Sequence, residues 1–187
     1  IFLGGIFAAA VNLSQFNNNV SVCTVVGNDR DISLPLKKFK KKIKSKIFYE
    51  PNKVTTRKRR FVESGYKKKI SEVYFMDDNL LGKNNKNKIL SYLKKETNKF
   101  DVVILIDYGH GFIDSDIYKI LKKKSKFLAI NCQTNSANLG FNLITKYPSS
   151  DFICVDEPEL RLAASDNVNE ISTIVQNKLL KKSNVKT

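Results

Sequence analysis

A short segment near the middle of the chain groups residue types that could carry chemistry. Asp107-Tyr108-Gly109-His110-Gly111 combines a carboxylate, a phenol and the single histidine of the sequence with two glycines. Glycine permits positive φ angles and lets a ligand approach the backbone closely. A helix predicted to begin at Asp114 would point amide donors into the same region. The segment therefore suits a binding turn, although an ordinary strand-to-helix turn with an Asp cap has the same composition.

An uncharged, amide-rich stretch follows at residues 131–142 (NCQTNSANLGFN). Neutral donors and acceptors at this density suit the hydroxyl groups of a sugar or a nucleotide. We take Asn131 and Asn135 as candidate substrate contacts. A polar surface loop in an Asn-rich chain is the alternative interpretation.

An acidic segment, Asp156-Glu157-Pro158-Glu159, opens a predicted helix. Asp156 and Glu159 could hold Mg²⁺ through water, because oxygen ligands suit that ion. Acidic residues and Pro are also common at helix starts for purely structural reasons.

A basic segment, residues 55–61 (TTRKRRF), places four cations in succession from Arg57 to Arg60. Arginine recognises phosphate through paired hydrogen bonds. An exposed basic strand edge, which discourages aggregation, has the same pattern.

Other familiar signatures are absent from the sequence. There is no GxxxxGK(S/T), GxGxxG or HExxH motif, and a single histidine gives little support to a nucleophilic triad. Gly4-Gly5, followed by Ala8-Ala9-Ala10, would let a helix approach a ligand or a sheet closely.

These segments follow or flank predicted secondary structure. We predict strands at residues 20–26, 46–49, 60–62, 72–76, 101–106, 127–130 and 152–155, and helices at 87–98, 114–124, 157–164 and 167–180. This alternation indicates an α/β domain with a mostly parallel sheet. Ligands bind beyond the carboxyl ends of such strands, so Asp107, the amide-rich stretch and Glu159 are expected on one side of the molecule.

Composition restricts the partners. The 187 residues carry a net charge of +15, but only five of the 33 basic residues are Arg, and the Lys form solvent-like runs. This pattern favours a compositional bias over a nucleic-acid surface. Three separated cysteines argue against zinc or disulfides and fit a reducing cytoplasm. Residues 1–11 are apolar but too short to span a bilayer and lack a basic leader, so we expect no membrane segment.

Taken in order, the segments resemble the PfkB/ribokinase family, and most closely the kinase module of bifunctional heptose-phosphate kinase/nucleotidyltransferases. Gly4-Gly5 with its small-residue helix is similar to the family's glycine signature. Residues 55–62 (TTRKRRFV) resemble its TTxKxRFV lid strand, 101–111 (DVVILIDYGHG) its DVVxxSDYGKG block, and 156–159 (DEPE) its NxxE motif. The chain departs from the family at Ala8, where Asn is usual, and at Ile106, His110 and Asp156.

The resemblance implies a ribokinase-like three-layer αβα sandwich with a mostly parallel sheet and a small β lid at roughly residues 46–78. It implies phosphorylation of a sugar or sugar phosphate with ATP and Mg²⁺. It places Gly4, Gly5 and Asn12 near the sugar. Lys58 and Arg60 would meet a substrate phosphate, Asp107 would face the site floor, and Asp156 and Glu159 would serve magnesium. It is also consistent with a homodimer that forms through the lid.

The family's late GAGD motif, which supplies the catalytic base and an anion hole, is not found in residues 1–187. We therefore expect a partial sugar-kinase domain, incomplete at both ends, that does not turn over ATP by itself. A non-catalytic sugar-phosphate or nucleotide binder of the same fold and the kinase part of a bifunctional sugar nucleotidyltransferase are alternatives. A nucleic-acid binder rests on charge alone.

Overall fold

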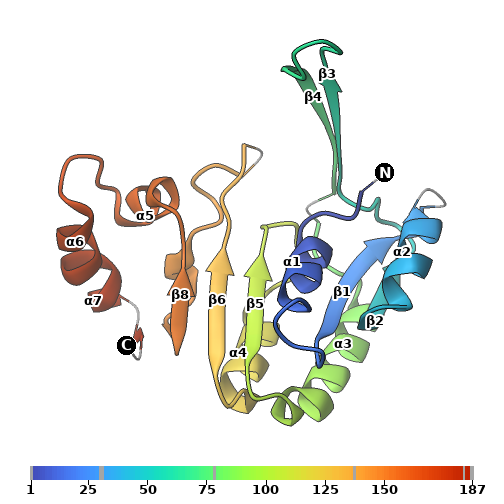
Figure 1. The fold of residues 1–187 in the computed structure, drawn as a ribbon. Helices are drawn as coiled ribbons and strands as arrows, with labels where there is room; N and C mark the ends of the chain where they lie inside the picture. The colour runs from blue at the N-terminus through green and yellow to red at the C-terminus, as the bar shows by residue number, and fades with distance from the viewer. Residues whose placement is uncertain (1, 30–31, 78, 137, 183, 186–187) are drawn as a thin grey trace. The chain divides into compact units, whose positions relative to one another are not determined.

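The computed structural model describes residues 2–29, 32–77, 79–136, 138–182 and 184–185. The chain folds as two compact units, Ile1–Asn85 and Lys86–Thr187. Strands and helices alternate along both units (Figure 1), as the sequence predicts.

The first unit is built on two parallel strands and two helices. Strand β1 (Ser21–Gly27) pairs with β2 (Lys44–Glu50), so that the two strands end together at Gly27 and Glu50. Helix α1 (Ile6–Leu13) precedes β1, and α2 (Ser33–Lys40) connects β1 to β2. A crossover helix between two parallel strands is the expected way to join them.

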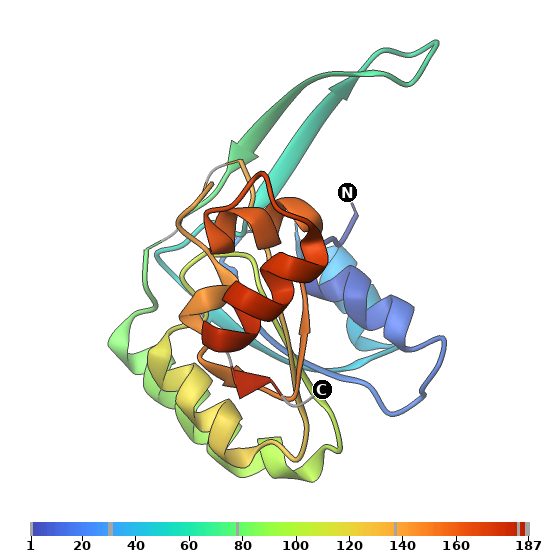
Figure 2. The ribbon, with the colours of Figure 1, turned by 90° about the vertical axis from the view of Figure 1, so that its left-hand side faces the viewer.

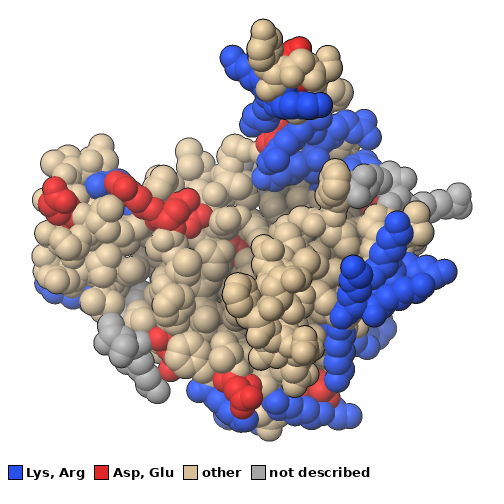
Figure 3. All heavy atoms as spheres, in the orientation of Figure 1, with Lys and Arg blue, Asp and Glu red and all other residues tan. Residues whose placement is uncertain are grey.

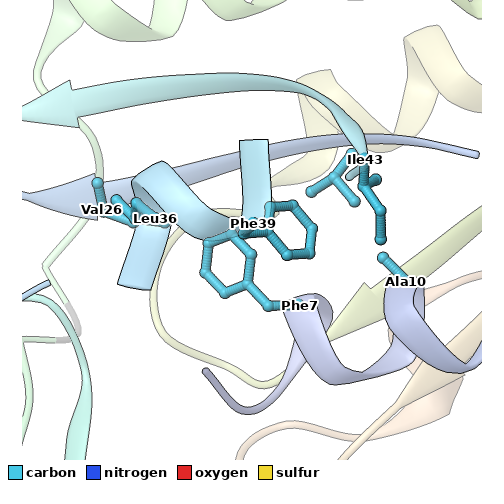
Figure 4. Close-up of a cluster of buried hydrophobic side chains, with 7 residues drawn as sticks. Phe7, Ala10, Val26, Leu36, Phe39 and Ile43 are labelled. Carbon is cyan, nitrogen blue, oxygen red and sulfur yellow. The ribbon is translucent and has the colours of Figure 1, made fainter. Parts of the chain in front are cut away.

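A compact apolar core holds this unit together (Figure 4). Its buried members are Phe7, Ala10, Val22, Val26, Leu36, Phe39 and Ile43. The rings of Phe7 and Phe39 meet edge to face, with centroids 4.9 Å apart, which is a favoured aromatic geometry. These two rings fix α1 against α2.

A two-stranded hairpin projects from the first unit in both ribbon views (Figures 1 and 2). Its antiparallel strands are β3 (Arg57–Val62) and β4 (Lys69–Phe75). We name this hairpin the lid. The hairpin lies within the region predicted as lid, roughly residues 46–78, and the strand predicted at 46–49 is part of β2, which pairs with β1.

The second unit contains a parallel sheet in the order β5-β6-β8. Its strands are β5 (Val103–Asp107), β6 (Leu128–Cys132) and β8 (Phe152–Cys154). Helix α3 (Lys83–Glu96) leads into this unit, a short 3-10 helix (Thr97–Lys99) follows it, and α4 (Ser115–Lys124) joins β5 to β6. The buried side chains of α3 and α4, such as Ile89 and Ile117, contribute to the core.

The last part of the chain is helical beside β8 (Figure 1). Its elements are a 3-10 helix (Ile144–Lys146), β7 (Ser149–Ser150), α5 (Glu157–Ala164), α6 (Ile171–Ile174), a π-helical turn (Val175–Leu179), α7 (Leu180–Lys182) and β9 (Asn184–Val185). β7 and β9 pair in parallel. Among the described residues, every helix is too short or too polar to cross a membrane. The predicted α/β class with parallel strands is confirmed.

Candidate functional site

Asp107, the last residue of β5, is a buried and fully engaged carboxylate. Only 3% of its surface is exposed. Its Oδ1 accepts a hydrogen bond from the Gly109 amide at 2.8 Å, and its Oδ2 accepts one from the Tyr147 hydroxyl at 2.6 Å. Lys146 forms an ion pair with the same Oδ2. A buried carboxylate requires such partners because burying an unpaired charge is very costly. Asp107 is therefore a fixed charge at the carboxyl edge of the sheet.

Two neighbouring groups remain protonated around this carboxylate. Burial raises the pKa of Tyr147, and the Asp107 charge raises it further. Burial raises the pKa of the Cys132 thiol to about 12, with Asp107 adding to the shift. The Cys132 Sγ donates to Asp107 Oδ2 over 3.9 Å. Tyr147 and Cys132 therefore keep their protons at physiological pH and act as hydrogen-bond donors to Asp107.

The turn after Asp107 packs tightly on the amide-rich stretch. Gly109 has a φ of 72°, in the left-handed region. A Cβ built on Gly109 would lie 2.1 Å from Asn138 Nδ2 and 2.9 Å from Asn142 Cγ. Glycine is thus required here twice, by the backbone angle and by the packing. His110 lies half-buried in the same turn.

The amides of the stretch tie neighbouring strand ends together. The side-chain nitrogens of Asn135 and Asn138 donate to the Tyr108 carbonyl at 3.1 and 3.0 Å. Asn142 Nδ2 donates to the carbonyls of Asp107 and Gln133. These bonds satisfy backbone carbonyls that turn residues would otherwise leave unpaired. Ala137 of this stretch lies outside the described residues.

Asn131, the first amide of the stretch, has a different role. It belongs to β6, and its Nδ2 donates to the Cys154 carbonyl at the end of β8, 2.8 Å away. The two predicted substrate contacts therefore both use an amide nitrogen to bind the backbone, Asn131 between strands and Asn135 between loops.

Asp156 and Glu159 form a reciprocal cap on α5. Asp156 Oδ1 accepts from the Glu159 amide at 2.8 Å, and Glu159 Oε2 accepts from the Asp156 amide at 3.1 Å. The other Glu159 oxygen, Oε1, accepts from the Thr134 amide at 3.0 Å. Glu159 is buried, with 6% exposed, whereas Asp156 is exposed. Within the described residues, no three His, Cys, Asp or Glu side chains gather as a metal site would require.

These contacts connect three segments that the sequence predicts to lie on one side. The Gln133 amide donates to the Asp107 carbonyl at 2.8 Å, and the next residue, Thr134, binds Glu159. Asp107, the amide-rich stretch and Glu159 thus form one continuous hydrogen-bonded edge of the second unit. The sequence did not indicate Lys146 and Tyr147, which complete it.

The lid of the first unit begins at the end of β1. The Gly27 amide donates to Thr55 Oγ1 at 2.9 Å, and the Thr55 amide donates to Asp29 Oδ2 at 2.6 Å. A Cβ on Gly27 would lie 2.2 Å from the Lys53 carbonyl oxygen. The chain that enters the lid therefore passes directly over the last residue of β1, where only glycine leaves room.

The chain that leaves the lid is held at the end of β2. Glu50 is buried, and its Oε2 accepts from the Asn85 side chain at 3.0 Å and from the Gly82 amide at 3.3 Å. Asn85 Nδ2 also donates to the Tyr49 carbonyl at 2.7 Å. Both connections of the lid are consequently anchored at strand ends of the same unit.

The four cations of β3 divide between the two faces of the lid, because side chains alternate along a strand. Lys58 and Arg60 share one face with their partners Tyr74 and Glu72. On the opposite face, Arg57 and Arg59 lie over the Phe75 ring, at 4.6 and 5.5 Å from its centroid. Figure 3 shows the blue Lys and Arg side chains gathered over this hairpin.

The glycine signature lies at the start of α1. Gly5 caps the helix with a φ of 54°, and a Cβ on Gly4 would meet no atom within 4 Å. Asn12 lies in the last turn of the same helix and is exposed. It lies seven positions after Gly5, which is about 10 Å along the helix axis. The structure thus places Asn12 and the two glycines at opposite ends of α1.

The sequence is similar to those of bifunctional proteins. It is 26% identical to the bifunctional protein HldE of Aliarcobacter butzleri over 180 residues, which cover 92% of this chain and 36% of that protein. It is 30% identical to HldE of Geobacter sulfurreducens over 115 residues, or 60% of this chain and 23% of that protein. The chain therefore spans about a third or less of the length of these relatives. No family model matches the sequence.

Solved structures share the fold at low sequence identity. A carbohydrate kinase from Agrobacterium tumefaciens matches with a TM-score of 0.65 and 16% identity, covering 91% of this chain and 54% of that one. Phosphofructokinase-2 from Escherichia coli, in its tetrameric inhibited form, matches with a TM-score of 0.68 and 8% identity over 98% and 60% of the two chains. Ribokinase from Giardia lamblia matches with a TM-score of 0.58 and 14% identity, covering 87% of this chain and 50% of that one.

Proposed function

The chain has the ribokinase-like fold of PfkB-type carbohydrate kinases, and from this premise we propose that it serves the ATP-dependent phosphorylation of a sugar or sugar phosphate. Within this class we propose a heptose-phosphate-like substrate, because the TTRKRRFV and DVVILIDYGHG segments resemble those of heptose-phosphate kinases. The similarity to bifunctional HldE proteins agrees with a resemblance to part of a bifunctional protein.

The lid supports this proposal most directly. It presents Lys58 and Arg60 on one face and is anchored at the carboxyl ends of β1 and β2. Ligands of α/β proteins bind beyond these strand ends. A guanidinium and an ammonium at this position suit the phosphate of a sugar phosphate. Gly4 and Gly5, with open space at Gly4, would admit the sugar close to the backbone.

The second unit has candidate polar groups of its own at the carboxyl edge of its sheet. Asp107 would act as a fixed negative floor, because Lys146 and Tyr147 hold its carboxylate in position. Asn131 and Asn135 would contribute their amide groups, whose nitrogens are already engaged.

Magnesium, bound with ATP, would neutralise charge that develops on the transferred phosphoryl group. The carboxylates of this chain fit an indirect role toward that ion. Asp156 is exposed and would reach it through water, as Mg²⁺ commonly requires. Glu159 would orient Asp156, because both its oxygens accept backbone amides.

A second candidate is a sugar-phosphate binder of the same fold that does not transfer phosphate. The observation that favours it concerns Asp107, the buried carboxylate at the carboxyl edge of the second unit. Its partners are already the Lys146 ammonium and the Tyr147 phenol. Residues 1–187 also contain no GAGD motif.

Two measurements on the 187-residue chain test these functions. Isothermal titration with a heptose or hexose phosphate and with the corresponding free sugar should show preferential binding of the phosphate. An ADP-release assay with the same sugars follows. Turnover would rule out the binder, whereas binding without turnover agrees with a partial kinase as well as with a binder. Equal or undetectable binding of both ligands would contradict both.

A further inference from the structure

Glu72 lies at the centre of the lid face that carries Lys58 and Arg60. It stands directly opposite Arg60 in the β3–β4 register, and its Oε2 accepts a hydrogen bond from Arg60 Nε. Directly opposed residues of an antiparallel pair share one face and interact. The Arg60 side chain is 62% exposed, whereas that of Glu72 is only 9% exposed. The carboxylate is covered by its neighbours, and the guanidinium reaches into solvent.

The second oxygen of Glu72 extends the same network. Oε1 accepts from the hydroxyl of Tyr74, which is two residues along β4 and therefore on the same face. The Tyr74 ring lies beneath Lys58, whose Nζ is 4.8 Å from the ring centroid. Glu72 thus contacts Arg60 directly and Lys58 through Tyr74, and Lys69 Nζ lies 4.0 Å from its Oε1.

An acidic residue at this position opposes simple anion binding. The hydrogen bonds from Tyr74 and Arg60 hold the pKa of Glu72 at about 2, so the carboxylate is ionised at neutral pH. Its negative charge weakens the attraction that Arg60 exerts on a phosphate. The attraction between this face and a phosphate therefore does not explain why position 72 carries a glutamate.

The orientation of the Arg60 guanidinium explains the glutamate better. A guanidinium has five N–H donors in one rigid plane. The bond to Glu72 engages Nε, and so it fixes the plane in which the two terminal nitrogens present their four N–H groups. Two parallel N–H donors match two phosphate oxygens only when that plane is set correctly. Fixing it before binding lowers the ordering cost of the complex.

We propose that Glu72 is a positioning residue that orients the Arg60 guanidinium for the phosphate of a sugar phosphate. This inference rests on the proposed function, because it takes Arg60 as the phosphate contact. What matters at Glu72 is an acceptor for Arg60 Nε–H, and the negative charge is secondary. Glutamine, which keeps the acceptor, should replace Glu72, whereas methionine, which has similar length and no strong acceptor, should not.

The test measures binding of a hexose 6-phosphate and of the free hexose to the 187-residue chain by NMR titration. Arg60→Ala and Glu72→Met should each weaken hexose phosphate binding about tenfold, the worth of one charge-assisted hydrogen bond. Glu72→Gln should stay within about twofold of the parent chain, and none of the variants should change binding of the free hexose. Arg59→Ala is the matched control, since Arg59 lies on the opposite face over Phe75.

A second readout follows the orientation itself. The Arg60 Nε–H signal should be protected from exchange with water in the parent chain and in Glu72→Gln, and unprotected in Glu72→Met. The Nε–H signal is read together with the backbone amide shifts of β3 and β4, which show whether Glu72→Met keeps the hairpin.

The outcomes separate the two proposals. If Arg60→Ala leaves hexose phosphate binding unchanged, Arg60 is not the phosphate contact. The part of the proposed function that assigns phosphate recognition to the lid is then wrong. If Arg60→Ala weakens binding but Glu72→Met does not, the positioning role of Glu72 is overturned alone. A loss in Glu72→Gln as large as that in Glu72→Met also overturns it, because charge rather than acceptor geometry would then be responsible.

Discussion

Lys146 pairs with Asp107, a residue 39 positions earlier that ends β5 and is almost completely buried. The Lys146 side chain itself is 37% exposed, so a partly exposed lysine neutralises a carboxylate that is buried at the end of the strand. Lys146 also donates to Asn142 Oδ1 and thereby connects Asp107 to the amide-rich stretch. The edge of the second unit is therefore organised by a lysine from a segment in which the sequence indicates no functional residue.

Replacing Lys146 with Met should destabilise the chain by about 2 kcal/mol, because Asp107 would keep its buried charge and lose the opposite one. Urea unfolding followed by circular dichroism measures this loss. Lys126→Met is the control, since Lys126 pairs with the highly exposed Asp101, and its loss should change the unfolding free energy far less than the loss of Lys146. Equal effects of the two substitutions would show that the Asp107 pair is not structurally important.

Gly27→Ala should displace the entrance of the lid. The new Cβ would lie 2.2 Å from the Lys53 carbonyl oxygen and 2.6 Å from the Thr55 nitrogen, both of them backbone atoms. We expect a loss of about 1–3 kcal/mol, as for other overpacked sites. Backbone amide shifts of Thr55 and of β3 should change together. Gly4→Ala, which meets open space, should leave the same shifts in place. Unchanged shifts in Gly27→Ala would contradict the anchoring of the lid at β1.

The three cysteines should differ sharply toward a thiol reagent. Burial raises the pKa of Cys23 to about 12, and burial with the Asp107 charge raises that of Cys132 to about 12, whereas Cys154 is exposed. Only the thiolate reacts readily, so Cys154 should be labelled first at pH 8 and the other two after denaturation. Raised pKa values also mean that stability is complete below pH 9, the unfolded value, and declines as the pH rises toward 12. Rapid labelling of all three in the native chain would contradict the raised pKa values of Cys23 and Cys132.

Acid should weaken the lid network only at low pH. The pKa of Glu72 is lowered from 4.5 to about 2, so its contribution is present above pH 4.5 and is lost as the pH falls through about 2. Exchange protection of the Arg60 Nε–H should consequently persist at pH 4 and vanish near pH 2. Loss of protection near pH 4.5 would mean that Tyr74 and Arg60 do not hold the Glu72 carboxylate.

Sequence patterns predicted the parts of the fold that local chemistry determines. The apolar run before Asp107 predicts β5, and Asp114 predicts the start of α4 through its side-chain cap. Helix α2 is missing from the predicted elements, because its lysines and Pro35 obscure the two core positions Leu36 and Phe39. The helix predicted at 167–180 begins later, at Ile171, because Asp166 holds the preceding turn through the amides of Val168 and Asn169.

The candidate site was predictable only in outline. The motif residues Asp107 and Glu159 are visible in the sequence, but their partners Lys146, Tyr147 and Thr134 are 25 to 40 positions away in the chain. Such pairings arise from the order of strands in the sheet and have no local pattern. The same holds for Glu50 and Asn85, which anchor the lid through contacts 35 residues apart. The predicted roles of Asn12, Asn131 and Asn135 in substrate binding stay predictions.

The central claim is that the lid recognises the phosphate of a sugar phosphate specifically, despite a net charge of +15. The most direct test titrates the ¹⁵N-labelled chain with a hexose 6-phosphate at about 150 mM salt, where general attraction between surface charges is screened. The account predicts amide shifts at Lys58 and Arg60 of β3 that the free hexose does not reproduce, and none at Lys37 to Lys40 of the lysine-rich α2. Equal shifts along α2 and β3, or shifts that disappear with added salt, would contradict it.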